Sequence, residues 1–137
     1  MTGASPFVRM ATLADTRFIE DHRSASQIEA QQYRGSLDHV VPTGGELLFV
    51  AGYGTTVMGS ASVTISDSHA NLQHIFVVPE AREVGLADSL MTYVLTELKT
   101  RGVSNIAGRA LPGDRATKNL FERHGLIAQT IIVGKSL

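Results

Sequence analysis

The arrangement of apolar and polar residues along the chain predicts six strands and four helices. Strict alternation, or a short apolar run between turn residues, is typical of a strand, whereas apolar residues three and four apart form one face of a helix. Strands are predicted at residues 7–11, 47–51, 57–65, 72–78, 105–110 and 126–133. Helices are predicted at residues 12–30 and 31–37, between Gly85 and Gly102, and between Asp114 and Gly125.

These elements indicate a single domain with a central mixed sheet. Strands and helices alternate only after residue 78, which favours a mostly antiparallel sheet over a fully parallel one. We therefore expect an α/β (α+β) fold in which six to seven strands are flanked by helices. The sequence contains no linker or internal repeat, and 137 residues suit one domain, so residues 1–137 are assigned to one unit.

Composition narrows the functional classes. The chain has no Cys, which excludes thiolate catalysis, Cys zinc sites and iron–sulfur clusters. A net charge of −1 argues against a nucleic-acid partner. No histidine pair has metal-ligand spacing beside a carboxylate, so no metal is expected. The apolar runs are too short to span a membrane and the first residues do not resemble a signal peptide, so we expect a cytoplasmic protein without a membrane partner.

The segment from residue 77 to residue 87 carries the strongest chemical signal. Pro79 ends an apolar strand, and a short loop leads into an amphipathic helix at Gly85. Free backbone N–H groups at such a helix start bind anions, helped by the positive end of the helix dipole. Gly85 has no Cβ to obstruct a phosphate, and Arg82 adds a positive charge. The alternative interpretation is an ordinary strand-to-helix turn.

The spacing of Arg82, Gly85 and Ala87 matches the Arg/Gln-x-x-Gly-x-Gly/Ala signature of the GCN5-related N-acetyltransferases (the GNAT family), which the chain resembles over essentially its whole length. The resemblance implies an acyl-CoA N-acyltransferase-like fold with acetyl-CoA as co-substrate. It also implies that amides of the loop hold the pyrophosphate and that the pantetheine arm pairs with the preceding strand. The residues implied at the cofactor are Phe76, Val77, Val78, Arg82, Glu83, Val84, Gly85, Leu86 and Ala87.

Two positions that resemble the family's proton-transfer sites carry other residues here. The family often has a carboxylate in the strand before the loop, where this chain has Gln73 and His74; His74 is the candidate general base, because imidazole titrates near neutral pH. The alternative is a hydrogen-bonded histidine of the sheet. The family's usual acid is a Tyr where this chain has Phe121, which has no proton to give and belongs either to the core or to the pantetheine contact. Asp114 is either the N-cap of that helix or a cofactor ligand.

Residues expected to select the acceptor are less specific. Glu29, Asp38 and Glu46 could attract a cationic amine, although loops are commonly acidic. His22 is predicted on an exposed face of the first helix, away from the chemistry.

The sequence therefore predicts an acetyl-CoA-dependent N-acetyltransferase that acts on a primary amine of a small molecule or peptide by direct attack in a ternary complex. Phe121 in place of the usual Tyr predicts a weak enzyme. The expected partners are acetyl-CoA and the amine, and the strand-rich C-terminus is consistent with a homodimer. Two alternatives remain open: a non-catalytic acetyl-CoA sensor of the same fold, and an interaction module whose cofactor site is unused.

Overall fold

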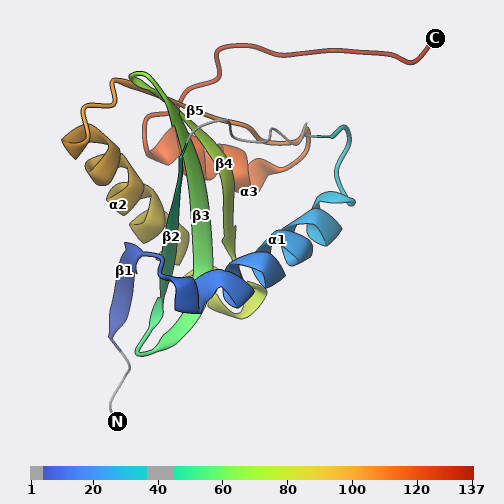
Figure 1. The fold of residues 1–137 in the computed structure, drawn as a ribbon. Helices are drawn as coiled ribbons and strands as arrows, with labels where there is room; N and C mark the ends of the chain where they lie inside the picture. The colour runs from blue at the N-terminus through green and yellow to red at the C-terminus, as the bar shows by residue number, and fades with distance from the viewer. Residues whose placement is uncertain (1–4, 37–44) are drawn as a thin grey trace.

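The computed structural model describes residues 5–36 and 45–137. Within these ranges five strands form one sheet in the order β1-β2-β3-β4-β5, with helices on both faces (Figure 1). The strands are β1 (Pro6–Met10), β2 (Glu46–Tyr53), β3 (Thr56–Ser66), β4 (His69–Val77) and β5 (Asn105–Gly108). The helices are α1 (Thr16–Ala30), α2 (Leu86–Thr100) and α3 (Arg115–Arg123), with short 3-10 turns at η1 (Leu13–Asp15) and η2 (Pro79–Ala81).

The predicted mixed sheet is confirmed. Neighbouring strands from β1 to β4 are antiparallel, and β5 joins β4 in parallel after the crossover through α2. Parallel neighbours need such a crossover, whereas the antiparallel strands follow one another through short turns or through α1.

Alternate residues of β3 give the sheet one apolar face and one polar face, because successive side chains of a strand point to opposite sides. Ala61 and Val63 are buried in the main core, which α2 completes with residues such as Leu90. Ser60 and Ser62 are buried on the other face, where a hydrogen bond ties β3 to α1. The side of the sheet under α2 is therefore an apolar core, and the side under α1 contains buried polar groups.

Two predicted elements are absent from the described structure. Residues 126–137 form no strand, so the sheet has five strands within the described ranges rather than six to seven. The segment leads away from the sheet (Figure 1), and its apolar residues Ile127, Ile131, Ile132 and Val133 are 72–91% exposed. Alternation shows that a strand could form, but a strand also needs a neighbour to pair its backbone groups, which the pattern does not specify.

The short helix predicted at residues 31–37 is also wrong for the part described. Residues 31–36 form turns and bends after the end of α1, and residue 37 lies outside the described ranges. Gly35 has a φ of +77°, which a right-handed helix does not accommodate.

An ion pair fastens the start of α1 to the edge of the sheet. Asp15, at the end of η1, is 4% exposed and accepts hydrogen bonds from the Arg9 guanidinium on β1 at 2.7 and 3.1 Å. It also accepts one from the Thr12 backbone N–H at 2.7 Å. The Arg9 guanidinium holds the pKa of the Asp15 carboxyl well below its ordinary value, at about 2, against the opposing effect of burial. This carboxylate is therefore charged at all ordinary pH values, and α1 begins at a fixed point.

Removing the guanidinium should destabilise the fold. Arg9→Met leaves the buried Asp15 carboxylate without its cationic partner, and we expect the free energy of unfolding to fall by about 1–3 kcal/mol. Urea denaturation at pH 7 measures the loss. Arg17→Met, on the exposed side of α1, is the matched control and should change stability by less than about 0.5 kcal/mol. Equal effects of the two variants would contradict the anchoring role of Arg9.

Candidate active site

A cleft of about 780 Å³ lies between α1, β4, α2 and α3. Most of the site residues predicted from the sequence line it: Gln73, His74, Phe76, Val77, Arg82, Glu83, Gly85, Leu86, Ala87, Asp114 and Phe121. Val78 and Val84 are not among the lining residues. The structure thus brings together residues from the strand, the loop and the last helix that are up to 48 positions apart in the sequence.

The start of α2 forms one end of this cleft and has the features of an anion site. Gly85 precedes the helix with a φ of +81°, and no side chain caps the helix. The first backbone bond of the helix runs from Ser89 N–H to the Gly85 carbonyl at 3.0 Å, so the N–H groups of residues 86–88 have no partner within the helix. A Cβ placed on Gly85 would meet no described atom within 4 Å. The helix start is open, with donors and a positive dipole end directed outward.

The acidic residue in the first turn of α2, Asp88, is paired with residues at the end of α3. Asp88 accepts hydrogen bonds from Arg123 at 3.1 and 3.2 Å, and its Oδ1 lies 2.8 Å from His124 Nε2. These partners, Arg123 first, lower the pKa of the Asp88 carboxyl. The sequence gives no sign of this role for Asp88, because its partners lie 35 and 36 positions later.

Arg82 reaches across the cleft toward α1. Its Nε donates to the Val77 carbonyl at 2.8 Å, and its Nη2 lies 2.8 Å from Oε2 of Glu29 on α1. The guanidinium also lies over the Phe76 ring, 5.2 Å from the ring centre. Arg82 therefore joins the loop, the end of β4 and the end of α1. The sequence predicted its position in the loop but not this direction of its side chain.

The acidic residues considered for the acceptor are divided in the structure. Glu29 lines the cleft, paired with Arg82. Glu46 on β2 pairs with Arg23 of α1 at 2.6 Å. Asp38 lies outside the described residues.

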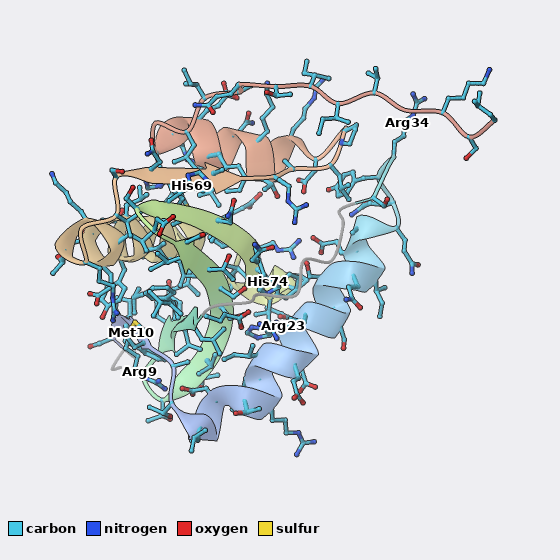
Figure 2. The ribbon with its side chains drawn as sticks, turned by 45° about the horizontal axis from the view of Figure 1, so that its top comes forward. Arg9, Met10, Arg23, Arg34, His69 and His74 are labelled. Carbon is cyan, nitrogen blue, oxygen red and sulfur yellow. The ribbon has the colours of Figure 1, made fainter. Side chains whose placement is uncertain are left out.

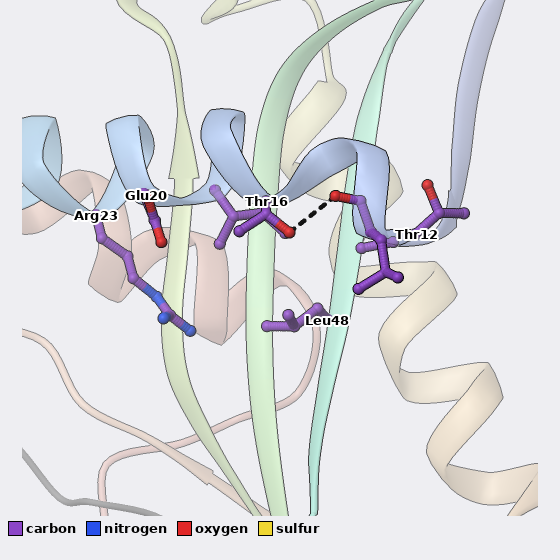
Figure 3. A pocket seen from close by; sticks show the side chains of 8 residues that line it. Thr12, Thr16, Glu20, Arg23 and Leu48 are labelled. Carbon is purple, nitrogen blue, oxygen red and sulfur yellow. Dashed lines mark hydrogen bonds between the residues drawn. The ribbon is translucent and has the colours of Figure 1, made fainter.

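A second hollow of about 450 Å³ lies by the first turns of α1 (Figure 3). Thr12, Thr16, Glu20, Arg23 and Leu48 line it, and the Thr16 hydroxyl donates to the Leu13 carbonyl at 2.9 Å. It shares no lining residue with the main cleft.

A chain of polar side chains runs from α1 to the cleft. Nδ1 of His22 on α1 lies 2.8 Å from Oγ of Ser60 on β3, and this oxygen lies 3.4 Å from Nε2 of His74 on β4. His22 is 5% exposed, so its prediction on an exposed face is wrong. The sequence neighbours of His22 are polar and suggest a solvated face, and its partner Ser60 is 38 positions away.

His74 is uncharged at neutral pH. Burial is the main cause that lowers the pKa of its imidazole to about 4, and the charges of Arg23 and His22 add to the effect. Figure 2 shows His74 and Arg23 between the sheet and α1. Burial also lowers the pKa of His22, opposed by the charge of Asp21. A neutral imidazole at the cleft wall has a lone pair that can accept a proton, although its lowered pKa makes it a weaker base than an ordinary histidine.

Gln73, beside His74 in the sequence, forms a structural bridge. Its amide nitrogen donates to the Thr64 hydroxyl of β3 at 3.1 Å, and its oxygen accepts from Arg109 after β5 at 3.4 Å.

Phe121 and Asp114 belong to the framework of α3. Phe121 is 8% exposed in the main core, and its ring tip packs on β5: a Cβ placed on Gly108 would lie 2.8 Å from Cζ of this ring. Asp114 is confirmed as the N-cap of α3, because its Oδ1 accepts from the Thr117 backbone N–H at 3.1 Å. Its other oxygen accepts from the Thr117 hydroxyl at 2.7 Å.

The model of the acetyltransferase (GNAT) family matches residues 7–126, which is most of the chain. The chain belongs to this family. No curated protein sequence matches it. In this GNAT protein the family match covers β1 from Phe7 onward and the whole of the other strands and helices described above.

Solved structures share the fold at low sequence identity. AAC(6')-Iy in complex with the bisubstrate analogue CoA-S-monomethyl-acetylneamine has a TM-score of 0.72 and 17% identity, over 98% of this chain and 99% of that one. An aminoglycoside acetyltransferase from an uncultured soil metagenomic sample, in complex with sisomicin, has a TM-score of 0.73 and 10% identity, over 96% and 95%. The ribosomal-protein-S18-alanine N-acetyltransferase from Escherichia coli has a TM-score of 0.69 and 18% identity, over 88% and 76%.

The described residues contain neither a metal-binding cluster nor a membrane-spanning helix. No group of three or more His, Cys, Asp or Glu residues in residues 5–36 and 45–137 could hold a metal ion. No helix in the same ranges is long and apolar enough to cross a membrane.

The lowered pKa of His74 should make the fold sensitive to acid. Between the ordinary histidine pKa of about 6.5 and the folded value of about 4, the unfolded chain binds a proton at this position that the folded chain does not. The stability contributed by neutral His74 is present above pH 6.5 and is lost as the pH falls through about 4.

We therefore expect the urea midpoint of the parent protein to fall between pH 7.5 and pH 5, and to fall less in His74→Gln. His69→Gln, an exposed position at the start of the same strand, should retain the parent's full pH dependence. Equal losses of stability in all three proteins between pH 7.5 and pH 5 would contradict the claim that His74 is buried in its neutral form.

Proposed function

We propose that this GNAT protein is an acetyl-CoA-dependent N-acetyltransferase that acetylates a primary amine of a small molecule or peptide by direct attack within a ternary complex. The observation that carries the proposal is the cleft itself, in which the open start of α2 and the neutral imidazole of His74 line one cavity. An anion site and a base in one cleft are the two parts that acetyl transfer from an anionic thioester requires.

The loop residues would hold the nucleotide end of acetyl-CoA. The backbone N–H groups of residues 86–88 have no partner within α2, and the space above Gly85 admits a phosphate without a steric barrier. Asp88 would not repel the phosphates strongly, since the Arg123 guanidinium is paired with its carboxylate. Bound acetyl-CoA supplies the reactive thioester; the chain's own part is to hold it, admit the amine and accept a proton.

The acceptor amine would enter beside α1. Glu29 is the acidic side chain of α1 that lines the cleft, and its carboxylate is shared with Arg82. The Glu29 carboxylate would attract a cationic amine, and the Arg82 guanidinium would attract the anionic acetyl-CoA. The similar structures with a bisubstrate analogue of neamine and with sisomicin support an amine acceptor.

Tyr33 is the candidate proton donor to the leaving thiolate. Its side chain lines the cleft from the turn after α1. Partial burial, with the charges of Asp114 and Glu29, raises the pKa of its phenol above the ordinary value, so the group is protonated at neutral pH. Phe121 offers no such proton, and its ring tip already meets β5.

The second candidate function is an acetyl-CoA sensor without turnover, and the observation that favours it is the absence of a hydroxyl on Phe121. Thermal unfolding with and without acetyl-CoA separates both candidates from an unused site, because a ligand that binds the native state raises its stability by about 2.7 kcal/mol at a hundredfold excess over Kd. Release of CoA thiol in the presence of neamine or a peptide with an N-terminal alanine then separates the enzyme from the sensor.

Blocking the helix start should weaken cofactor binding without unfolding the protein. Gly85→Val places a branched side chain where the phosphates approach, and we expect calorimetry to give a Kd for acetyl-CoA at least about tenfold higher, which is 1.4 kcal/mol. Gly102→Val is the control, because both glycines have a φ of +81° and open space at the Cβ position. The two variants share the backbone strain, so equal loss of affinity would contradict the proposed phosphate site.

The proton donor can be tested by removing one phenol and adding another. Tyr33→Phe should lower kcat about tenfold to a hundredfold, which reaches the lower end of the contribution of a positioned acid. Phe121→Tyr should leave kcat unchanged and reduce stability by about 1–3 kcal/mol, since its hydroxyl would be forced against Gly108. A rise in kcat in Phe121→Tyr, measured by steady-state kinetics beside a urea curve, would instead place the acid at position 121.

A further inference from the structure

The hydroxyl of Ser60 lies between two imidazoles that come from different elements. His22 from α1 is on one side at 2.8 Å and His74 from β4 is on the other at 3.4 Å. Both rings also lie near Phe76, whose ring centre is 5.5 Å from that of His22 and 6.3 Å from that of His74. Ser60 is 1% exposed and His22 is 5% exposed, so these contacts lie in the interior and end at the cleft, which His74 lines.

A hydroxyl between two ring nitrogens has two arrangements, because it donates one hydrogen bond and accepts another. In the first, His74 Nε2–H donates to Ser60 and the Ser60 hydroxyl donates to His22 Nδ1. His74 then keeps a lone pair on Nδ1 and can accept a proton. In the second, both bonds are reversed, and His74 carries its proton on Nδ1. Only the first arrangement allows His74 to act as the base.

We propose that His22 is a positioning residue of acetyl transfer, which holds His74 in its proton-accepting tautomer through Ser60 and takes up the proton that His74 receives. The inference rests on the proposed function. As the amine nitrogen bonds to the acetyl carbon, its proton passes to His74 Nδ1. The Nε2 proton of His74 moves to Ser60, and the Ser60 hydroxyl proton moves to His22 Nδ1.

The remaining atoms and charges balance in the same step. The carbon–sulfur bond breaks with its electron pair on the CoA sulfur, which takes a proton from Tyr33 or from water. His22 carries the positive charge until its Nδ1 proton returns to Ser60 and the Ser60 proton returns to His74 Nε2. The proton on His74 Nδ1 then passes to the Tyr33 phenolate, or to the hydroxide, that was left when the sulfur was protonated. No oxidant or reductant is required.

The charged groups around the three residues favour this direction of transfer. Burial lowers the pKa of both imidazoles; in addition, Arg23 on α1 disfavours a positive charge on His74, whereas Asp21 on the same helix favours one on His22. Glu46 on β2 is paired with Arg23 and holds it in place. Moving the proton to His22 therefore moves the positive charge away from Arg23 and toward Asp21.

Ser62 provides a matched control for Ser60. Both hydroxyls are 1% exposed on the same face of β3, and Ser62 Oγ has no hydrogen-bond partner among the described residues. Ser60→Ala should lower kcat for acetyl-CoA with neamine or the alanine-initiated peptide at least about tenfold, with KM changed less than threefold. Ser62→Ala should leave both within twofold of the parent. Equal kcat values in the two variants would overturn the relay.

His22→Asn separates holding from proton uptake. The Asn oxygen can still accept from the Ser60 hydroxyl, but the side chain cannot take up a proton. We expect its kcat to fall as far as that of Ser60→Ala. A kcat equal to the parent's would show that His22 only holds Ser60, and would overturn proton uptake.

Nitrogen-15 NMR of the imidazoles tests the arrangement independently of turnover. In the parent and in His22→Asn, His74 should be protonated on Nε2 and bare on Nδ1; in Ser60→Ala it should become a mixture of tautomers. A proton on Nδ1 of His74 in the parent would overturn the inference. If the parent protein acetylates neither amine, the proposed function is refuted instead. The NMR spectra would then still show whether Ser60 and His22 set the tautomer of His74.

Discussion

The attachment of α1 to the sheet by charged pairs is the constraint on which the cleft depends. Just before α1, Asp15 pairs with Arg9 of β1. Within α1, Arg23 pairs with Glu46 of β2, and near the end of the helix Glu29 pairs with Arg82. α1 buries one apolar side chain, Ile19, together with His22, whereas α2 buries five apolar residues. Apolar burial therefore fixes α2, and directional polar contacts fix α1.

This division suits a protein that must hold a cofactor and admit an acceptor. The open start of α2 is built on the apolar core, where close packing resists displacement. The acceptor side is built on α1, whose contacts are ion pairs that ligands of either charge can compete for. Glu29 and Arg82 are the pair most exposed to such competition, because both line the cleft.

Local patterns predicted the elements that depend on local causes. The apolar spacing of α2, the N-cap Asp114 and the loop between Pro79 and Gly85 could all be read from neighbouring residues. The sequence did not predict the contacts between distant elements: His22 with Ser60, Arg82 with Glu29, and Asp88 with α3. A residue in a polar run looks solvated until the fold supplies its partner. The predicted last strand failed for the same reason, since alternation does not name a neighbouring strand.

The alternation of Ser60, Ala61, Ser62 and Val63 also protects the pairing of the sheet during folding. If β3 slipped by one residue against β2 and β4, both serines would enter the apolar core under α2, and Ala61 and Val63 would face the imidazole of His22. The Ser60 hydroxyl would then lose both of its imidazole partners, at about 1–3 kcal/mol. The misregistered pairing is therefore less stable, so Ser60, which connects α1 to His74, also helps the chain reject its nearest misfolded alternative.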